Sequence, residues 1–244
     1  MATLQPGSKV YNLVMKKHRF FCEQSLGSAH SAVISSASLL NQLRHVFRLE
    51  IGEQIILFDN SGFDYTSEIS RYEKDGVTIT IVGKEKNNVS LNKEIYLFAS
   101  IIKKDNFEWI VEKATEMGVS HIIPILSARS EKKNLNMERL RKIIIESSEQ
   151  SGRGTIPTIV DILNLKDALL KYASVGTIVW HPEAPKFVSQ DLQGKNGLFI
   201  GPEGGWSEEE LQMFADYSIQ VRSLGSQILR SETAVIATLS TLVF

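Results

Sequence analysis

The distribution of apolar residues changes near residues 84–93, and this change constrains the fold more than any other feature. Residues 17–83 contain short runs of β-branched and aromatic residues, such as Ile55–Phe58 and Val77–Val82, separated by turn-forming residues. Such runs predict short strands in a small β-barrel-like module. After residue 93, apolar runs alternate with amphipathic segments, which predicts an α/β domain with a mostly parallel sheet.

Each part of the chain contains further predicted elements. In the first part we expect a short helix over Ser38–Arg48, and the polar residues 84–93 predict a linker. In the second part, Asp105 is the candidate N-cap of a helix that extends to Met117. The other expected elements are strands at Tyr65–Ile69, Ile95–Ile101, Val119–Leu126, Thr177–Trp180, Leu198–Ile200 and Gln220–Leu224, and helices at Met137–Gln150, 207–217 and 232–243.

Composition excludes several classes of protein. The chain has 244 residues, of which 43% are hydrophobic, so it can bury a core without covalent cross-links. Its single cysteine, Cys22, excludes an internal disulfide and fits a reducing cytoplasm. The sequence contains no apolar run of about 18 residues, so we expect no transmembrane helix.

The charge is nearly balanced but unevenly distributed. A net charge of −1 argues against a general nucleic-acid binder. Basic side chains are nevertheless concentrated in residues 1–48 and 129–154. These two segments can form one electrostatic surface for a polyanion, and they can equally be solvated faces of the protein.

A glycine-rich turn follows the apolar run Gly197–Ile200. The turn is Gly201-Pro-Glu-Gly-Gly205, and Ser207 and Glu210 after it have the Ser-x-x-Glu spacing of a capping box. The turn therefore lies between a strand and a helix N-terminus, at the edge where α/β sheets bind ligands. Glycine lets the backbone approach a ligand closely, although such a turn can also serve only to reverse the chain.

The segment Ser223–Ala234 repeats this design. Gly225 follows a predicted strand, and Ser231 is a candidate cap for the next helix. Arg230 precedes that cap, where a positive charge is unfavourable for the helix dipole. A residue that breaks a local rule is a candidate for a functional site, and the alternative is a surface arginine.

Neither segment has the pattern of a phosphate-binding loop. The first turn lacks the Gly-Lys-Ser/Thr of a P-loop and the Gly-x-Gly-x-x-Gly of a dinucleotide site. The carboxylate of Glu203 in its centre would also repel phosphate. The turn therefore suits a neutral or cationic ligand, or one that is recognised through base edges.

The two glycine-containing segments, Phe199–Leu211 and Leu224–Ala234, resemble the signature segments of the RsmE family. These proteins are SPOUT-class methyltransferases of small-subunit ribosomal RNA. The resemblance covers residues 17–244, and residues 1–16 outside it are expected to form a disordered extension. Further segments similar to the family are Arg19–Phe21, His45–Gly52, Glu112–Gly118, Arg129-Ser130 and Glu149–Arg153.

The resemblance implies a fold and an activity. The fold would be an N-terminal PUA-like, RNA-binding β-barrel over residues 17–86 and a C-terminal SPOUT α/β domain with a deep trefoil knot over residues 93–244. The activity would be methylation of N3 of a specific uridine in 16S ribosomal RNA, with S-adenosyl-L-methionine as methyl donor. The protein would be a cytoplasmic homodimer that acts on the small ribosomal subunit, without a metal ion or a membrane.

The resemblance also implies a cofactor site made of three loops. The first loop, Trp180–Glu183, matches the family loosely, and His181 in it is either a base or a structural residue. The expected cofactor-binding residues are Trp180, His181, Pro182, Ile200, Gly201, Pro202, Glu203, Gly204, Gly205, Leu224, Gly225, Ile228, Leu229 and Thr233.

The expected reaction needs a base and a donor of positive charge, because uridine N3 carries a proton. Arg230 cannot be the base, since guanidinium stays protonated, and it is the expected electrostatic stabiliser. Glu203 is the candidate base provided that it is buried, and its alternative role is to hold backbone N–H groups or the positive end of the cofactor. The expected RNA-binding residues are Arg19, Arg44, Arg48, Lys132, Lys133, Arg139 and Arg153.

A non-enzymatic, RNA-binding ribosome assembly factor with the same fold is the alternative function. Both glycine-containing segments are complete, which disfavours this alternative. Binding of S-adenosylmethionine separates the two functions, because an assembly factor does not require it.

Overall fold

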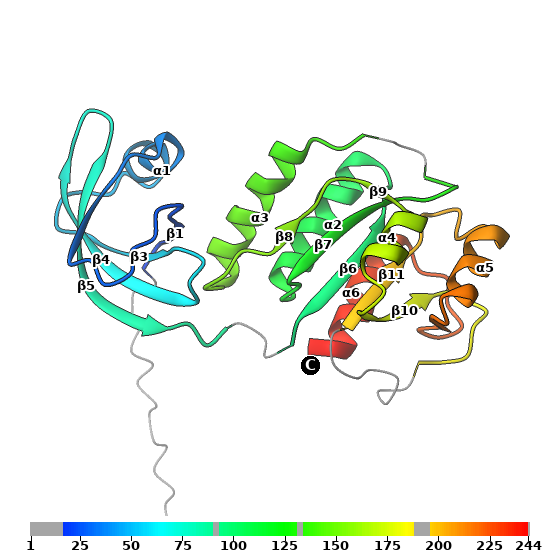
Figure 1. Cartoon of the computed structure of the whole chain (residues 1–244). Helices are drawn as coiled ribbons and strands as arrows, with labels where there is room; N and C mark the ends of the chain where they lie inside the picture. The colour runs from blue at the N-terminus through cyan, green and yellow to red at the C-terminus, as the bar shows by residue number, and fades with distance from the viewer. Residues whose placement is uncertain (1–16, 90–92, 131–133, 188–195, 244) are drawn as a thin grey trace, which may run out of the picture.

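The structure, a computed structural model, describes residues 17–89, 93–130, 134–187 and 196–243. Its strands form two separate sheets, one in each half of the chain (Figure 1). The N-terminal sheet has the strand order β1-β3-β4-β5-β2. The C-terminal sheet has the order β12-β10-β11-β6-β7-β8, and β9 also pairs with β7. The expected extension at residues 1–16 lies outside the described residues.

The N-terminal domain is a curled sheet around its own core, which confirms the prediction of a small β-domain. Its strands β3, β4 and β5 pair antiparallel, whereas β1 pairs parallel with β3. Strand β5 extends to Lys86, so the first residues of the predicted linker belong to the sheet. The elements are β1 (Arg19–Phe21), β2 (Ser31–Ile34), α1 (Ala37–Asn41), the π-helical turn η1 (Gln42–Val46), β3 (Gln54–Phe58), β4 (Phe63–Tyr72) and β5 (Val77–Lys86).

The C-terminal domain is an α/β domain in which every described strand pairing is parallel, as predicted. Its strands β6 and β11 are buried along their whole length, which explains their continuous apolar runs. The elements are β6 (Ile95–Ser100), α2 (Lys104–Glu116), β7 (His121–Leu126), α3 (Met137–Ser151), β8 (Thr158–Ile159), β9 (Leu163–Asn164), α4 (Leu165–Lys171), β10 (Gly176–Trp180), β11 (Asn196–Ile200), α5 (Glu208–Asp216), β12 (Gln220–Arg222) and α6 (Ser231–Val243).

At two further predicted boundaries the structure gives a physical reason for the difference. Asp105 is not the N-cap of α2, because Lys103 occupies that position and Asp105 lies inside the first turn. There its negative charge still favours the helix dipole. Strand β12 ends at Arg222 rather than Leu224, because Ser223 no longer pairs with β10 and instead forms an isolated parallel bridge with Lys186, donating its N–H to the carbonyl of Pro185 at 2.9 Å.

Helices cover both faces of the parallel sheet. Helices α2, α3 and α6 enclose one apolar cluster with strands β6 and β11, and α4 and α5 enclose another on the opposite face. None of the helices in the described part of the chain is long and apolar enough to cross a membrane. The trefoil knot stays a prediction.

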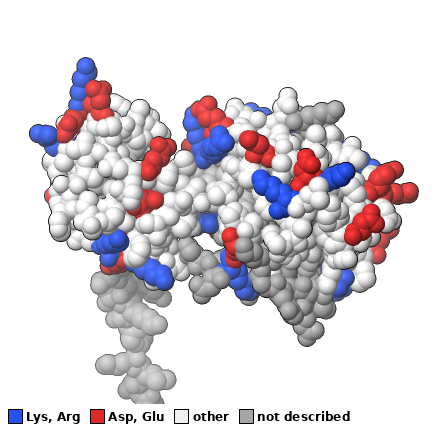
Figure 2. Space-filling view, viewed as in Figure 1, with Lys and Arg blue, Asp and Glu red and all other residues white. Residues whose placement is uncertain are grey.

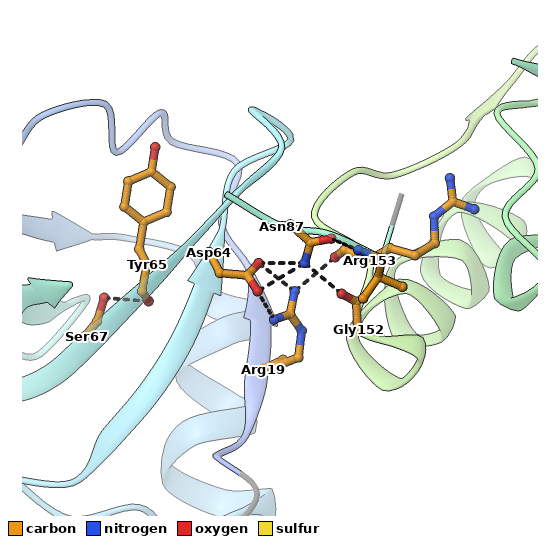
Figure 3. A network of polar contacts seen from close by, with 8 residues as sticks. Arg19, Asp64, Tyr65, Ser67, Asn87, Gly152 and Arg153 are labelled. Carbon is orange, nitrogen blue, oxygen red and sulfur yellow. Dashed lines mark hydrogen bonds and ion pairs between the residues drawn. The ribbon is translucent and has the colours of Figure 1, made fainter. Parts of the chain in front are cut away.

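A partly buried polar network joins the two domains, and we call it the domain joint; Figure 3 shows its bonds around Arg19, Asp64 and Asn87. The domain joint consists of Arg19, Asp64, Asn87, Glu149, Gly152 and Arg153. The guanidinium of Arg19 donates to both carboxylate oxygens of Asp64 at 2.6 and 2.9 Å, and to the carbonyl of Arg153 at 3.0 Å. The amide of Asn87 donates to the same carboxylate and, at 2.9 Å, to the carbonyl of Gly152.

The C-terminal side of the domain joint is anchored in the core of the α/β domain. Arg153 donates to the carbonyls of Thr115 and Val119, both at 2.8 Å. Glu149 accepts the backbone N–H of Phe21 at 2.9 Å. The bonds of Glu149 and Arg19 therefore run from the N-terminal sheet to α3 and the residues directly after it.

Two of the arginines predicted to bind RNA lie in the domain joint. Arg153 is buried, and its Nη1 donates to two backbone carbonyls. It is therefore not placed to bind phosphate. Arg19 is likewise enclosed, because Asp64 and the carbonyl of Arg153 occupy its donors. Both residues hold the domains together.

Candidate functional site

A cavity of about 300 Å³ lies where β10 and β11 end and α6 begins. The three loops that the sequence singled out meet around it. Its lining includes every predicted cofactor-binding residue except Thr233, and it adds five others. The added residues are Arg129, Trp206, Gln227, Ser231 and Ala234.

The glycine turn makes room for side chains of the protein itself. A Cβ atom on Gly201 would lie 3.1 Å from Nε1 of Trp206, and one on Gly204 would lie 3.3 Å from Cβ of Arg129. Only Gly205 has a positive φ, +69°, in this turn. The glycines at 201 and 204 therefore let an indole and an arginine pack against the turn, which the sequence pattern did not reveal.

Short hydrogen bonds connect the turn to its neighbours. Ser207 and Glu210 form the predicted capping box of α5. The buried carboxylate of Glu210 also accepts the backbone N–H of Ala128 at 2.8 Å, so it links α5 to the loop after β7. The hydroxyl of Ser231 donates to the carbonyl of Gly201 at 2.7 Å, and Ser231 is the first residue of α6 rather than its cap.

Arg129 extends from the loop after β7 to the rim of the cavity. Its Nη1 donates to the carbonyl of Gly204 at 2.7 Å. Among the described lining residues it is the only lysine or arginine. In the sequence, Arg129 belongs to a family segment and to the basic residues 129–154, and its position after a parallel strand is a further signal that could have identified it.

The predicted catalytic residues do not occupy the interior of the cavity. Glu203 lines the cavity but is exposed, so the burial required for its role as a base is absent in the single chain. Arg230 is exposed and lies outside the lining, as does Thr233. The ring of His181 accepts the backbone N–H of Glu183 at 3.3 Å, which fits its structural role.

Two buried tryptophans contribute to the lining of the cavity. Trp180 is 8% exposed and Trp206 is 4% exposed. The indole N–H of each lacks a hydrogen-bond partner among the described residues. Buried donors are normally paired, so these two N–H groups are exceptions in the wall of the cavity.

The other predicted RNA-binding residues are distributed over both domains. Arg44 donates to the carbonyl of Glu73 and lies 4.7 Å from the ring centre of Tyr72. Arg48 is exposed, and Arg139 is exposed with Nε 3.4 Å from the carboxylate of Glu108. On the face shown in Figure 2, basic and acidic side chains are interspersed. Lys132 and Lys133 lie outside the described residues.

Comparison with known proteins agrees with this architecture. The model of the RNA methyltransferase domain matches residues 89–243, and that of the RNA methyltransferase PUA domain matches residues 43–82. Ribosomal RNA small subunit methyltransferase E of Bacillus subtilis (strain 168) is 30% identical over 242 residues, covering 91% of this chain and 94% of the relative. The protein of that name from Rickettsia conorii is 28% identical over 235 residues, covering 93% and 95%.

A solved structure extends the similarity to three dimensions. Ribosomal RNA small subunit methyltransferase E from Neisseria gonorrhoeae, crystallised with bound S-adenosyl methionine, matches this chain with a TM-score of 0.85 at 28% identity. The match covers 93% of this chain and 97% of that one, so both domains are shared. With a cavity of this kind, a matching domain model and relatives along nearly its whole length, the chain belongs to the ribosomal RNA small subunit methyltransferase E family.

Proposed function

We propose that this protein transfers a methyl group from S-adenosylmethionine to N3 of a specific uridine in 16S ribosomal RNA. The observation that carries this proposal is the cavity, which gathers thirteen of the fourteen residues predicted to bind the cofactor. It lies within the region that matches the RNA methyltransferase domain. The relative from Neisseria gonorrhoeae, which shares this fold, was crystallised with S-adenosyl methionine.

The chemistry of the cavity fits this cofactor. Its volume is at the lower end of the range for small-molecule sites. Ile200, Leu224 and Leu229 supply apolar surface, and the rings of Trp180 and Trp206 add to it. S-adenosylmethionine supplies a methyl group on a sulfonium, so the protein's task is to hold it in line with the uridine and to exclude water.

We propose a homodimer whose second copy covers the rim of the cavity at Ile228 and leaves Arg129 accessible to RNA. The support is Ile228, which lines the cavity and is 86% exposed in the single chain. A partner over this rim would also bury Glu203, the condition for its role as the base that takes the N3 proton. Light scattering tests the oligomeric state, and Ile228→Asp is expected to shift it towards monomer; a persistent monomer in the unaltered protein would contradict the dimer.

The RNA is proposed to lie across both domains of a cytoplasmic protein that acts on the small ribosomal subunit. Exposed Arg48 and Arg139 remain the candidate phosphate contacts among the described residues. Such contacts give affinity without sequence choice and weaken with salt. Binding to small subunits is therefore expected to weaken as the salt concentration rises.

One experiment tests the proposed function directly. Small subunits are incubated with the protein and isotope-labelled S-adenosylmethionine, and the RNA is mapped by mass spectrometry. We expect a label on N3 of a single uridine. Tight binding of the subunit without methylation, and without affinity for the cofactor in calorimetry, would instead support the assembly factor.

A further inference from the structure

We propose that Arg129 is a catalytic residue that donates to a uracil oxygen and stabilises the negative charge that develops as N3 loses its proton. This role rests on the proposed function and deepens it. The starting observation is that Arg129 is the one lysine or arginine in the described lining of the cavity. Arg230, the arginine that the sequence favoured, lies outside that lining.

The stem of Arg129 is held against the glycine turn, whereas most of its guanidinium N–H groups have no partner among the described residues. Its stem packs against Gly204, because a Cβ there would lie only 3.3 Å from Cβ and Cδ of Arg129. One guanidinium N–H is bound to the carbonyl of Gly204 at 2.7 Å. Guanidinium has five N–H donors, so most of them remain available to a ligand.

The exposure of Arg129 decides between the two anionic groups that could meet it. The carboxylate of the cofactor's methionine and an oxygen of the uracil would both suit guanidinium. Arg129 is exposed at the rim rather than buried like Trp180 and Trp206. An RNA base has to reach the cavity from the solvent side, where the exposed guanidinium of Arg129 lies, and this favours the uracil.

The acidic residues around Arg129 leave its charge available. Glu210 accepts the N–H groups of Ala128 and Ser207. Glu209 is exposed, and its pKa is lowered first by hydrogen bonds at the start of α5 and last by the charge of Arg129. Glu203 is also at the rim, on the same turn as Gly204. Among the described residues Arg129 forms no ion pair within 4.0 Å, so its positive charge is not consumed by a protein carboxylate.

The proposed step balances in atoms and charge. The N3 proton passes to a base, the N3 electron pair forms a bond to the methyl carbon, and the bond from methyl to sulfur breaks with its electrons on sulfur. The uracil is anionic between proton loss and methyl transfer, and its charge lies partly on O2 and O4. Arg129 stays protonated throughout and lowers the energy of that charge.

Arg129→Ala and Arg129→Lys test this role on small subunits. The loss of one charge-stabilising donor typically lowers kcat about 100-fold, and we expect this for Arg129→Ala, with partial activity in Arg129→Lys. Calorimetry is expected to give unchanged affinity for S-adenosylmethionine. The limb on which activity rises with pH is expected to move to higher pH, because the bound uracil then loses its proton less readily.

Arg139→Ala is the matched control, an exposed arginine on α3 that is proposed to contact phosphate. It is expected to raise KM for the subunit without moving the pH profile. Small subunits reconstituted with RNA that contains 5-fluorouridine, whose N3 proton is more acidic, should restore part of the activity of Arg129→Ala and none of that lost in Arg139→Ala.

Three results would overturn the role of Arg129. A large loss of cofactor affinity with an unmoved pH profile would place the arginine on the cofactor's carboxylate. A uniform loss of rate at every pH, without rescue by 5-fluorouridine, would leave it only a structural residue of the glycine turn. No methylation by the unaltered protein would overturn the proposed function, and the role of Arg129 with it.

Discussion

The rim of the cavity and the domain joint both place arginines against backbone carbonyls, yet the two regions use them differently. In the joint, Arg153 is 6% exposed and donates to two carbonyls of the α/β core. At the rim, Arg129 is exposed and donates to one carbonyl. The difference teaches that burial of the guanidinium, rather than the presence of an arginine in a basic segment, separates a structural residue from one that can bind a ligand.

The two regions also differ in how far their charged groups are removed from water. Burial lowers the pKa of Arg153 to about 10, so its guanidinium is still charged at neutral pH. A buried charge is costly to hold, and it is tolerated because carbonyl oxygens surround it. The rim holds exposed charges instead, and these are free to change partners when RNA and cofactor arrive.

The largest expected effect separates the two arginines by stability. Arg153→Ala leaves the carbonyls of Thr115 and Val119 without their donor inside the protein, and it should lower the free energy of unfolding by about 3 kcal/mol. Arg129→Ala, a surface change, should shift it by no more than about 0.5 kcal/mol. Urea unfolding measures both, and equal losses would contradict the comparison.

A smaller loss is expected from Gly154→Ala. The new Cβ would lie 2.5 Å from Cβ of Asn87, so Asn87 must leave its bonds to Asp64 and Gly152. Such overpacking should cost about 2 kcal/mol. Gly83→Ala is the control, since its Cβ would meet Thr66 at 3.6 Å; if it destabilises the protein equally, steric displacement of Asn87 is not the cause.

Much of the fold could be predicted because the local signals agree with the tertiary structure. The alternation of strands and helices after residue 93 predicted the parallel sheet, and the Ser207–Glu210 spacing predicted the start of α5. Asp105 misled because an acidic residue is equally favourable at the cap and in the first turn.

The site could be predicted less completely. The glycine segments identified the loops around the cavity, because their strand ends meet at one edge of the sheet. The neighbours of Gly201 and Gly204 come from elsewhere in the fold, and no local pattern reveals them. Likewise, Arg19 and Arg153 lie 134 positions apart in the sequence, so the hydrogen bond between them depends on tertiary packing.

The third prediction concerns the rim. Ser207→Ala removes the side-chain acceptor for the N–H of Glu210 and should cost about 1 kcal/mol of stability. It also loosens the turn that lines the cavity, so affinity for S-adenosylmethionine should fall. Asn164→Ala removes the equivalent cap of α4, outside the cavity lining. It should cost similar stability in thermal unfolding but leave the calorimetric affinity unchanged; equal affinities in both variants would show that the rim does not depend on its cap.

The smallest expected effect is on how steeply the free energy of unfolding changes with pH, and it arises from Glu149 in the domain joint. Burial raises the pKa of Glu149, opposed by the N–H of Phe21, Gln42 and the charge of Arg19, and reinforced by Glu146. The folded protein therefore holds this proton more tightly than the unfolded chain does, so the free energy of unfolding falls as pH rises from 4.5, the ordinary value, through the raised value. Glu149→Gln has no such proton, and its stability should fall less over that window when Tm is measured from pH 4 to about pH 8. Parallel curves for the two proteins would mean that Glu149 titrates like an exposed carboxylate, and that the joint opens in solution.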